Sequence, residues 1–264
     1  MTYSILRFDA PMMSFGAPIV SEEGLIQPFP PLSMMTGMLA NALGYDRREP
    51  EKHERLQRGL SYAVREDVPG EKIVDYQTVW LGKKGDRRQG DHDGHLFAKS
   101  KKGSRAWTTW GHLDQRGTGN TDGTIIRNRE YWAGAVYTVA LHVEHLSADQ
   151  VAHAFQKPER PLFIGRQPCL PGVRMYQGTV GAEKPRYALQ DEQTFANDEN
   201  GQRLTPTRIW HTCEADASGN VTPVTDARDW VNQIHVGERH VREESLADDW
   251  FQAMDTLHPS SNES

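Results

Sequence analysis

Hydrophobic residues recur in short segments along the first two thirds of the chain, with spacings that predict strands and helices in turn. The expected strands are residues 3–8, 61–66, 74–81, 125–126, 131–143 and 162–164, and the expected helices are 33–43, 51–60 and 148–156. Ser147 is expected to cap the last helix and Pro158 to stop it. The order β-α-β followed by β-α-β predicts an α+β fold with a ferredoxin-like (RRM-like) core.

The rest of the chain divides around this core. Residues 82–123 are rich in Gly, Asp, Lys and Ser, which is typical of a loop or hairpin. In the last third, residues 204–213 and 221–224 are expected as strands, 246–257 as an amphipathic helix and 259–264 as a frayed end. The expected domains are therefore a core of residues 1–79 and 124–184, an insertion of residues 80–123 and a β-rich extension of residues 185–264.

The start of the helix at 33–43 is the most informative local feature. A proline-rich stretch, residues 28–31, precedes Ser33, an expected N-cap, and Gly44 follows the apolar residues as a stop. The N–H groups at a helix start and the helix dipole attract anions, and a phosphate backbone is one candidate. The alternative is a well-capped core helix without a ligand.

Composition limits the classes of function. The 264 residues carry a net charge of −6, which argues against a free-standing nucleic-acid binder but leaves room for a local basic surface. The two cysteines, Cys169 and Cys213, have no metal-type spacing and suit a reduced compartment. The chain shows no apolar stretch near the roughly 20 residues that span a bilayer, and no signal-peptide pattern. A cytoplasmic protein without a membrane partner is expected.

The charge is distributed unevenly along the chain. Residues 83–131 hold eleven Lys and Arg against six Asp and Glu, a local charge of +5, so the remainder carries about −11. Trp80, Trp107 and Trp110 lie beside or within this basic segment. Basic residues interleaved with aromatics are typical of a hairpin that follows phosphates and stacks on bases. The alternative is a solvated insertion whose tryptophans fold back onto the core.

Motifs for catalysis and metal binding are sparse. The stretch 91–95, Asp-His-Asp-Gly-His, has zinc-type ligands but no second cluster nearby, which favours a polar loop. A metal-independent RNA-cleaving set could be assembled from Tyr76, Lys83 or Lys84, and His92 or His95. No nucleophile elbow, P-loop or dinucleotide motif occurs. No catalytic residue, metal or cofactor is therefore expected, and endoribonuclease activity stays as the alternative.

Four segments in order resemble one family. They are Ala10-Pro11 through Ser14-Phe15-Gly16 to Pro31-x-Ser33-x-x-x-Gly37 and Gly44; residues 63–70 with 75–78; residues 129–141; and residues 158–169. Together they resemble the CasD family, the RAMP-type subunit of type I-E CRISPR surveillance complexes (Cascade). Such a resemblance implies a RAMP core with an inserted thumb-like β-hairpin.

The resemblance also implies a function. A CasD-like subunit would bind the 5′ handle of a CRISPR RNA without cutting it, contact the Cascade backbone and large subunits, and meet foreign DNA indirectly. Phosphates would lie at the helix start and at the loop after residue 164, and splayed bases along the basic segment. The expected RNA-binding residues are Ser33, Thr36, Gly37, Tyr76, Trp80, Lys83, Lys84, Arg127, Arg129, Gly165 and Arg166. For Arg166 the alternative is a salt bridge to a core carboxylate.

Overall fold

The computed structural model describes residues 1–17, 24–80, 97–98, 105–106, 124–198 and 200–246. The chain forms two compact units, one of residues 1–20, 25–73 and 130–264 and the other of residues 21–24 and 74–129. It contains both helices and strands, and strands predominate among the described residues.

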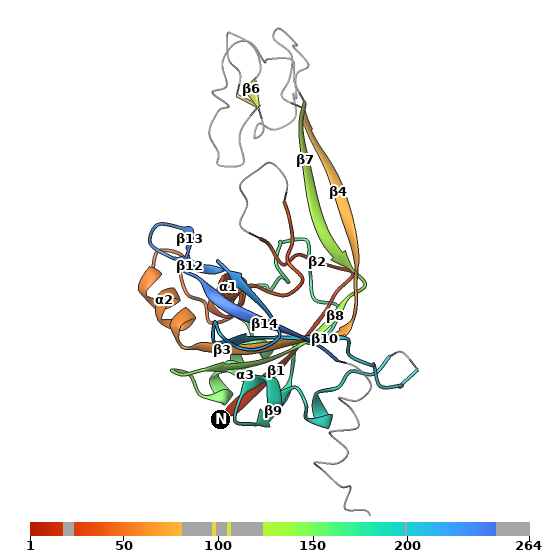
Figure 1. Cartoon of the computed structure of the whole chain (residues 1–264). Helices are drawn as coiled ribbons and strands as arrows, with labels where there is room; N and C mark the ends of the chain where they lie inside the picture. The colour runs from red at the N-terminus through yellow and green to blue at the C-terminus, as the bar shows by residue number, and fades with distance from the viewer. Residues whose placement is uncertain (18–23, 81–96, 99–104, 107–123, 199, 247–264) are drawn as a thin grey trace, which may run out of the picture. The chain divides into compact units, whose positions relative to one another are not determined.

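The first unit is built on a seven-stranded sheet with the order β11-β14-β10-β3-β8-β1-β9 (Figure 1). Its strands are β1 (Thr2–Asp9), β3 (Leu60–Val68), β8 (Val136–Val143), β9 (Tyr176–Gly181), β10 (Arg208–Cys213), β11 (Asn220–Val224) and β14 (Arg239–Ser245). Every neighbouring pair is antiparallel. The sheet therefore brings the C-terminal strands directly beside β3 in the middle of the sequence.

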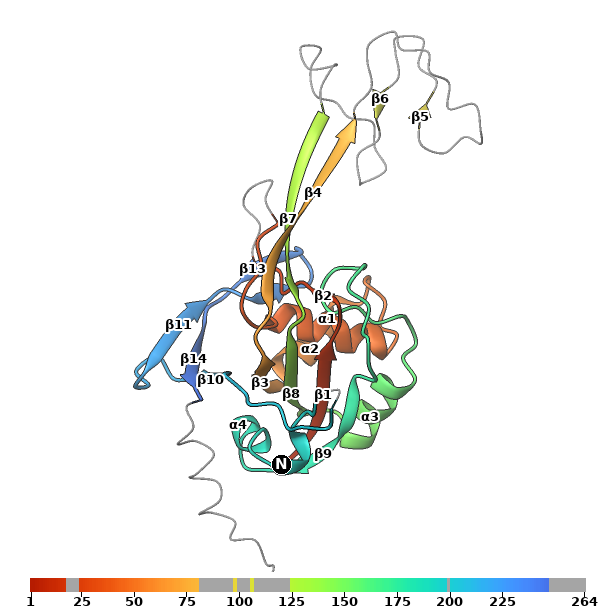
Figure 2. The same ribbon diagram turned by 90° about the vertical axis from the view of Figure 1, so that its right-hand side faces the viewer.

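Both faces of this sheet are covered because side chains alternate along its strands. Leu6 and Phe8 of β1 pack with Val139 of β8 against the helices α1 (Leu32–Ala42), α2 (Pro50–Arg58) and α3 (Ala148–Gln156). Ile5 and Ala140 face the short helix α4 (Pro185–Ala188) on the opposite side (Figure 2).

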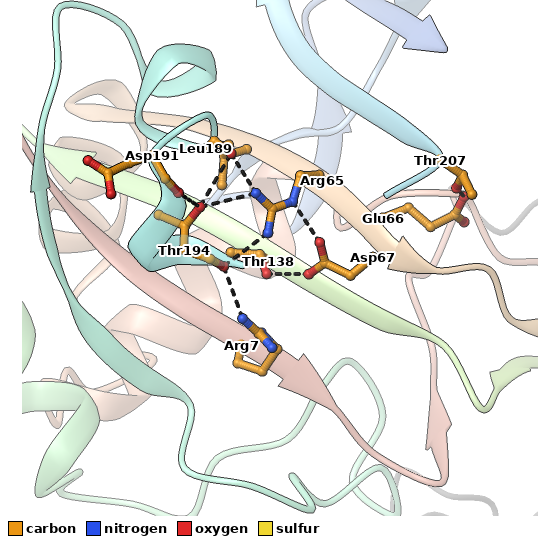
Figure 3. Close-up of polar contacts among 9 residues, drawn as sticks. All are labelled: Arg7, Arg65, Glu66, Asp67, Thr138, Leu189, Asp191, Thr194 and Thr207. Carbon is orange, nitrogen blue, oxygen red and sulfur yellow. Dashed lines mark hydrogen bonds and ion pairs between the residues drawn. The ribbon is translucent and has the colours of Figure 1, made fainter. Parts of the chain in front are cut away.

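A buried polar network ties the segment after α4 to the sheet (Figure 3). Arg65 is 0% exposed, and its Nε donates to Asp67 Oδ1 at 2.6 Å. The remaining guanidinium nitrogens donate to the main-chain carbonyls of Leu189 and Thr194, the latter at 2.9 Å and in the 3-10 turn η1 (Glu192–Thr194). Thr138 donates to the other oxygen of Asp67. Burial lowers the pKa of Arg65, and the paired carboxylate offsets part of that cost.

Smaller sheets complete the described structure. Strands β2 (Met12–Met13), β7 (Thr124–Ala133) and β4 (Glu71–Trp80) form a three-stranded sheet with β7 in the centre. Strands β12 (Ala227–Asp229) and β13 (Ile234–Val236) form a hairpin, and β5 (Phe97–Ala98) pairs with β6 (Arg105–Ala106).

Several sequence predictions are confirmed at the level of elements. The strand at 3–8 is β1, the helix at 51–60 is α2, and the helix at 148–156 is α3 with the expected Ser147 cap. Ser147 and Gln150 form a reciprocal capping box. The strands expected at 204–213 and 221–224 are β10 and β11.

Two strand predictions were wrong, and two further predictions cannot be compared. Residues 162–164 form no strand; the edge of the sheet beside β1 is β9, twelve residues further on. Residues 131–143 do not form one strand, because Gly134 turns the chain at a φ of 68° between β7 and β8. The end at 259–264, and all of the helix expected at 246–257 except its first residue, lie outside the described residues. The short helix α4 and the strands β12, β13 and β14 were not predicted.

Candidate nucleic-acid interface

A cleft of about 580 Å³ opens beside the first turns of α1. Four parts of the chain contribute to its walls: the segment after β2, helix α1, the loop after residue 161, and the hairpin β12–β13. The lining residues are Ser14, Gly16, Ala17, Pro31, Ser33, Met34, Gly37, Met38, Asn41, Leu162, Phe163, Gly165, Arg166, Arg228, Trp230 and His235. The cleft thus joins two segments that the sequence singled out, the start of α1 and the Gly165–Arg166 loop.

Helix α1 starts differently from the prediction. Its N-cap is Pro31, and Ser33 lies inside the helix without capping it. The N–H groups of Leu32 and Ser33 instead donate to the side-chain and main-chain oxygens of Asp226, each at 2.9 Å. A protein carboxylate therefore already occupies the position at the helix N-terminus where a phosphate was expected. Phosphate binding by these N–H groups would therefore require Asp226 to be displaced.

Asp226 is itself buried and paired. Its side chain is 0% exposed and lies 2.7 Å from the guanidinium of Arg239, which also donates to the Tyr62 hydroxyl at 2.7 Å. Tyr62 in turn donates to the carbonyl of Pro30, just before the helix. This chain of bonds links the C-terminal region to the entrance of α1, so that the hairpin following Asp226 is held next to the cleft.

The expected residues of α1 have different positions. Ser33 and Gly37 line the cleft. Thr36 is 0% exposed, and its hydroxyl donates to Leu32 O at 2.8 Å within the helix. The Thr36 side chain therefore faces the core and is not among the residues that line the cleft, and its RNA contact stays a prediction.

The Gly165–Arg166 loop packs closely on the segment after β2. Gly165 has a φ of 97°, and a Cβ there would lie 1.7 Å from the carbonyl oxygen of Ser14. The Ser14 N–H donates to Ile164 O at 3.1 Å, and the Ile164 N–H donates to Cys169 O at 2.8 Å. Cys169 is buried within this loop, which raises the pKa of its thiol. Only glycine permits this close approach, so the loop forms a fixed wall of the cleft.

Arg166 extends from that wall toward β7. Its Nη1 donates to the main-chain carbonyl of Glu130 at 2.8 Å, and its guanidinium carbon lies 4.9 Å from the centre of the Tyr131 ring. These contacts hold a positive charge at the cleft. Asn41 fixes the other end of the loop to α1, since its amide donates to Pro161 O at 2.6 Å.

The hairpin β12–β13 supplies the wall that the sequence predictions did not include. The Gln57 side chain of α2 accepts from the Arg228 N–H and donates to the Arg228 carbonyl, both at 3.0 Å. The Trp230 ring lies 4.7 Å from the His53 ring, centre to centre. Burial, together with the charge of Arg228, lowers the pKa of His235. The sequence Arg-Asp-Trp at 228–230 combines a basic and an aromatic residue, as does the basic segment at 83–131 with Trp80 beside it. This combination is the sequence feature from which the hairpin could have been predicted as part of the site.

The other expected contacts lie elsewhere. Tyr76, which is 61% exposed, and Arg127 and Arg129 belong to the unit of residues 74–129. Trp80 is the last residue of β4, and nothing is described of its side chain. Lys83 and Lys84, together with the histidines at 92 and 95 of the alternative cleavage set, lie outside the described residues. In the part of the chain that is described, no group of three His, Cys, Asp or Glu residues is placed to hold a metal, and no helix is long and apolar enough to cross a bilayer.

Comparisons with known proteins agree on one family. A family model described as "CRISPR-associated protein (Cas_Cas5)" matches residues 5–242. The "CRISPR system Cascade subunit CasD" of Escherichia coli (strain K12) is 27% identical over 200 residues, which are 75% of this chain and 80% of that protein.

Solved structures show the same fold at lower identity. A chain of a "CRISPR RNA-guided surveillance complex" matches with a TM-score of 0.60 and 21% identity, covering 98% of this chain and 100% of that chain. A "Crystal structure of Cas protein" matches with a TM-score of 0.59 and 21% identity, covering 95% and 97%. Because the family model spans nearly the whole chain and the fold agrees, this protein belongs to the Cas5 family of CRISPR-associated proteins.

Proposed function

We propose that this chain is a non-catalytic CRISPR RNA-binding subunit of a type I Cascade-like antiviral surveillance complex. In this proposal the cleft beside α1 holds part of the 5′ handle of the guide RNA. The carrying observation is that Ser33 and Gly37 of α1 meet Gly165 and Arg166 at one cleft, although more than 120 residues separate the two pairs. The Cascade subunit named among the relatives supports the same assignment.

The strand order supports a RAMP-type core. Elements β1, α1, β3, β8, α3 and β9 follow each other as β-α-β-β-α-β, and their strands are adjacent in the order β3-β8-β1-β9. We assign this set as a ferredoxin-like core. Helix α2 is an addition between α1 and β3.

The insertion between β4 and β7 is assigned as the thumb. Residues 80–123 would contact the neighbouring backbone subunit, and Tyr76, Trp80, Lys83, Lys84, Arg127 and Arg129 would bind splayed bases and phosphates of the handle. The large subunit, which would recognise foreign DNA, would dock on the same protein. A complex that carries guide RNA implies a cytoplasmic location.

Binding of labelled CRISPR repeat RNA to the purified protein, in the absence of metal, tests the proposal. The expected result is RNA that is bound, uncut and released by salt, since phosphate contacts depend on counterion release. Arg166→Ala should weaken binding about tenfold and make the log–log salt slope less negative by about 0.7, the contribution of one single-strand phosphate.

Arg48→Ala is the matched control, because Arg48 is exposed and pairs only locally with Asp46 in the described contacts. It should leave the affinity and the slope unchanged. Cut RNA would favour the endoribonuclease alternative, and no binding by the folded protein would leave only a protein-scaffold function.

A further inference from the structure

Three residues that line the cleft each carry a buried polar atom without a hydrogen-bond partner. Among the described residues only five side-chain atoms are buried without a partner, and Ser14 Oγ, Arg228 Nε and His235 Nδ1 are three of them. Buried polar atoms in folded proteins nearly always have partners, either in the protein or in a bound molecule. Their concentration at one cleft indicates that a polar occupant completes the site.

The main chain that carries these three residues is anchored by other parts of the chain. Arg228 and His235 are directly opposite each other in the β12–β13 register. Gln57 fixes the main chain of Arg228 by two hydrogen bonds of 3.0 Å, and Ile164 fixes that of Ser14 by one of 3.1 Å. The guanidinium of Arg228 is also held, since its Nη2 donates to Gln233 Oε1 at 2.9 Å. The main chain of the site is therefore in place before any ligand arrives, which reduces the entropic cost of binding.

The chemistry of these atoms selects a phosphate. A guanidinium Nε–H, a hydroxyl and the Nδ1–H of a protonated imidazole can all donate to phosphodiester oxygens, and the planar guanidinium of arginine matches the geometry of phosphate oxygens. Arg166 adds a second positive charge to the lining of the same cleft. Met34, Phe163 and Trp230 add apolar and aromatic surface, which suits the sugar and base attached to that phosphate.

We propose that the hairpin β12–β13 completes the RNA site, with Arg228, His235 and Ser14 binding one phosphodiester of the guide RNA. This inference rests on the proposed function and assigns a role to residues beyond 185, where the sequence pattern predicted none. An acidic segment of a neighbouring protein could offer oxygens of the same kind, so the experiment has to locate the contact on the RNA itself.

The test uses the full chain and a set of repeat RNAs, each with one uncharged methylphosphonate linkage. Arg228→Gln should weaken binding of unmodified RNA about tenfold. In one RNA of the set, the methylphosphonate should weaken binding to the wild-type protein by a similar factor. The same RNA should bind the Arg228→Gln variant no more weakly than unmodified RNA does. That pattern assigns the phosphate to this arginine, by the logic of a double-mutant cycle.

Ser14→Ala provides a second variant that removes only an unpartnered hydroxyl. It should fold with an unchanged unfolding midpoint and bind RNA about threefold more weakly, with the loss confined to the same linkage. Arg48→Gln serves as the control and should match wild type at every linkage. These variants keep the test valid even if Arg228→Gln does not fold.

The outcomes separate this inference from the function on which it rests. Wild-type RNA binding that Arg228→Gln and Ser14→Ala leave unchanged would overturn the inference while the proposed function stands. Loss of affinity without any linkage dependence would also overturn it and would favour a protein segment as the occupant of the hairpin wall. Failure of the folded wild-type protein to bind RNA would overturn the proposed function.

Discussion

Single residues in this protein combine burial with charge, and Arg65 is the clearest case. The sequence motif at 63–70 contributed to the family resemblance, yet Arg65 and Asp67 lie against α4 and η1 and take no part in the cleft. Glu66, 1% exposed, accepts two hydrogen bonds of 2.8 Å from Arg208 on the neighbouring strand. Charged residues in the motif thus fix the sheet and the segment after it.

Arg65→Met should lower the free energy of unfolding by about 3–5 kcal/mol, because Asp67 would remain buried without its cation. Denaturant unfolding measures this loss. The control is Arg48→Met, which removes an arginine–aspartate pair of the same sequence spacing from the surface and should cause no measurable change. A loss below about 1 kcal/mol for Arg65→Met would show that the network contributes little to stability.

At the scale of elements, local patterns predicted those structures that local interactions determine. Helix α3 has its own capping box, and α2 has Pro50 in its first turn, so both could be located from sequence. The cap of α1 could not be predicted, because Asp226 lies 194 residues from Leu32 along the chain. Residues 162–164 have strand-like composition, but the loop that contains them is held by Ser14 and Asn41 and pairs with no strand in the described part of the chain.

The same reasoning explains what was found and missed at the site. The start of α1 and the Gly165–Arg166 loop have distinctive local sequences, and both were identified. Ser14, Arg228 and His235 are brought to one cleft only when β14 pairs with β10, the neighbour of β3, and the hairpin before β14 packs beside α1 and α2. The spacing of residues within each of these segments does not indicate that they meet in the folded protein.

Gly165→Ala should disrupt the loop that forms one wall of the cleft. The added Cβ would overlap the Ser14 carbonyl oxygen, so the loop must move away, and both stability and RNA affinity should fall. Gly134→Ala is the matched control: Gly134 also has a positive φ, 68°, but its Cβ would meet nothing within 4 Å. The control should lose only about 1–2 kcal/mol of stability, from backbone strain, and keep its affinity. Equal effects of the two substitutions on RNA binding would contradict the assigned role of the loop.

At the scale of the whole molecule, buried tyrosines make stability depend on pH in the alkaline range. Tyr62 is 5% and Tyr137 0% exposed, and burial is the first cause that raises the pKa of each well above its ordinary value. For Tyr137 the neighbouring carboxylate of Glu66 raises the pKa further. The folded protein therefore retains phenolic protons that the unfolded chain loses.

The free energy of unfolding should fall as the pH rises above about 10, the ordinary tyrosine pKa, and should not depend on these groups at lower pH. Above that pH the tyrosines of the unfolded chain lose protons that the buried tyrosines of the folded protein retain. Ionisation therefore stabilises the unfolded state, and the free energy of unfolding decreases. Urea unfolding at several alkaline pH values measures the slope, and Tyr137→Phe should reduce it. An identical slope in the variant would show that Tyr137 ionises normally in the folded protein.

Photo-cross-linking of the full chain to a repeat RNA that carries 4-thiouridine, followed by peptide mass spectrometry, tests the central claim most directly. That claim is that the cleft formed by α1, the Gly165–Arg166 loop and the hairpin β12–β13 holds guide RNA. The account predicts cross-linked peptides that contain residues 31–41, 162–166 and 228–235, and their loss when unlabelled repeat RNA competes. Cross-links that avoid all three segments and concentrate on the opposite face of the sheet, at residues 185–194, would contradict it.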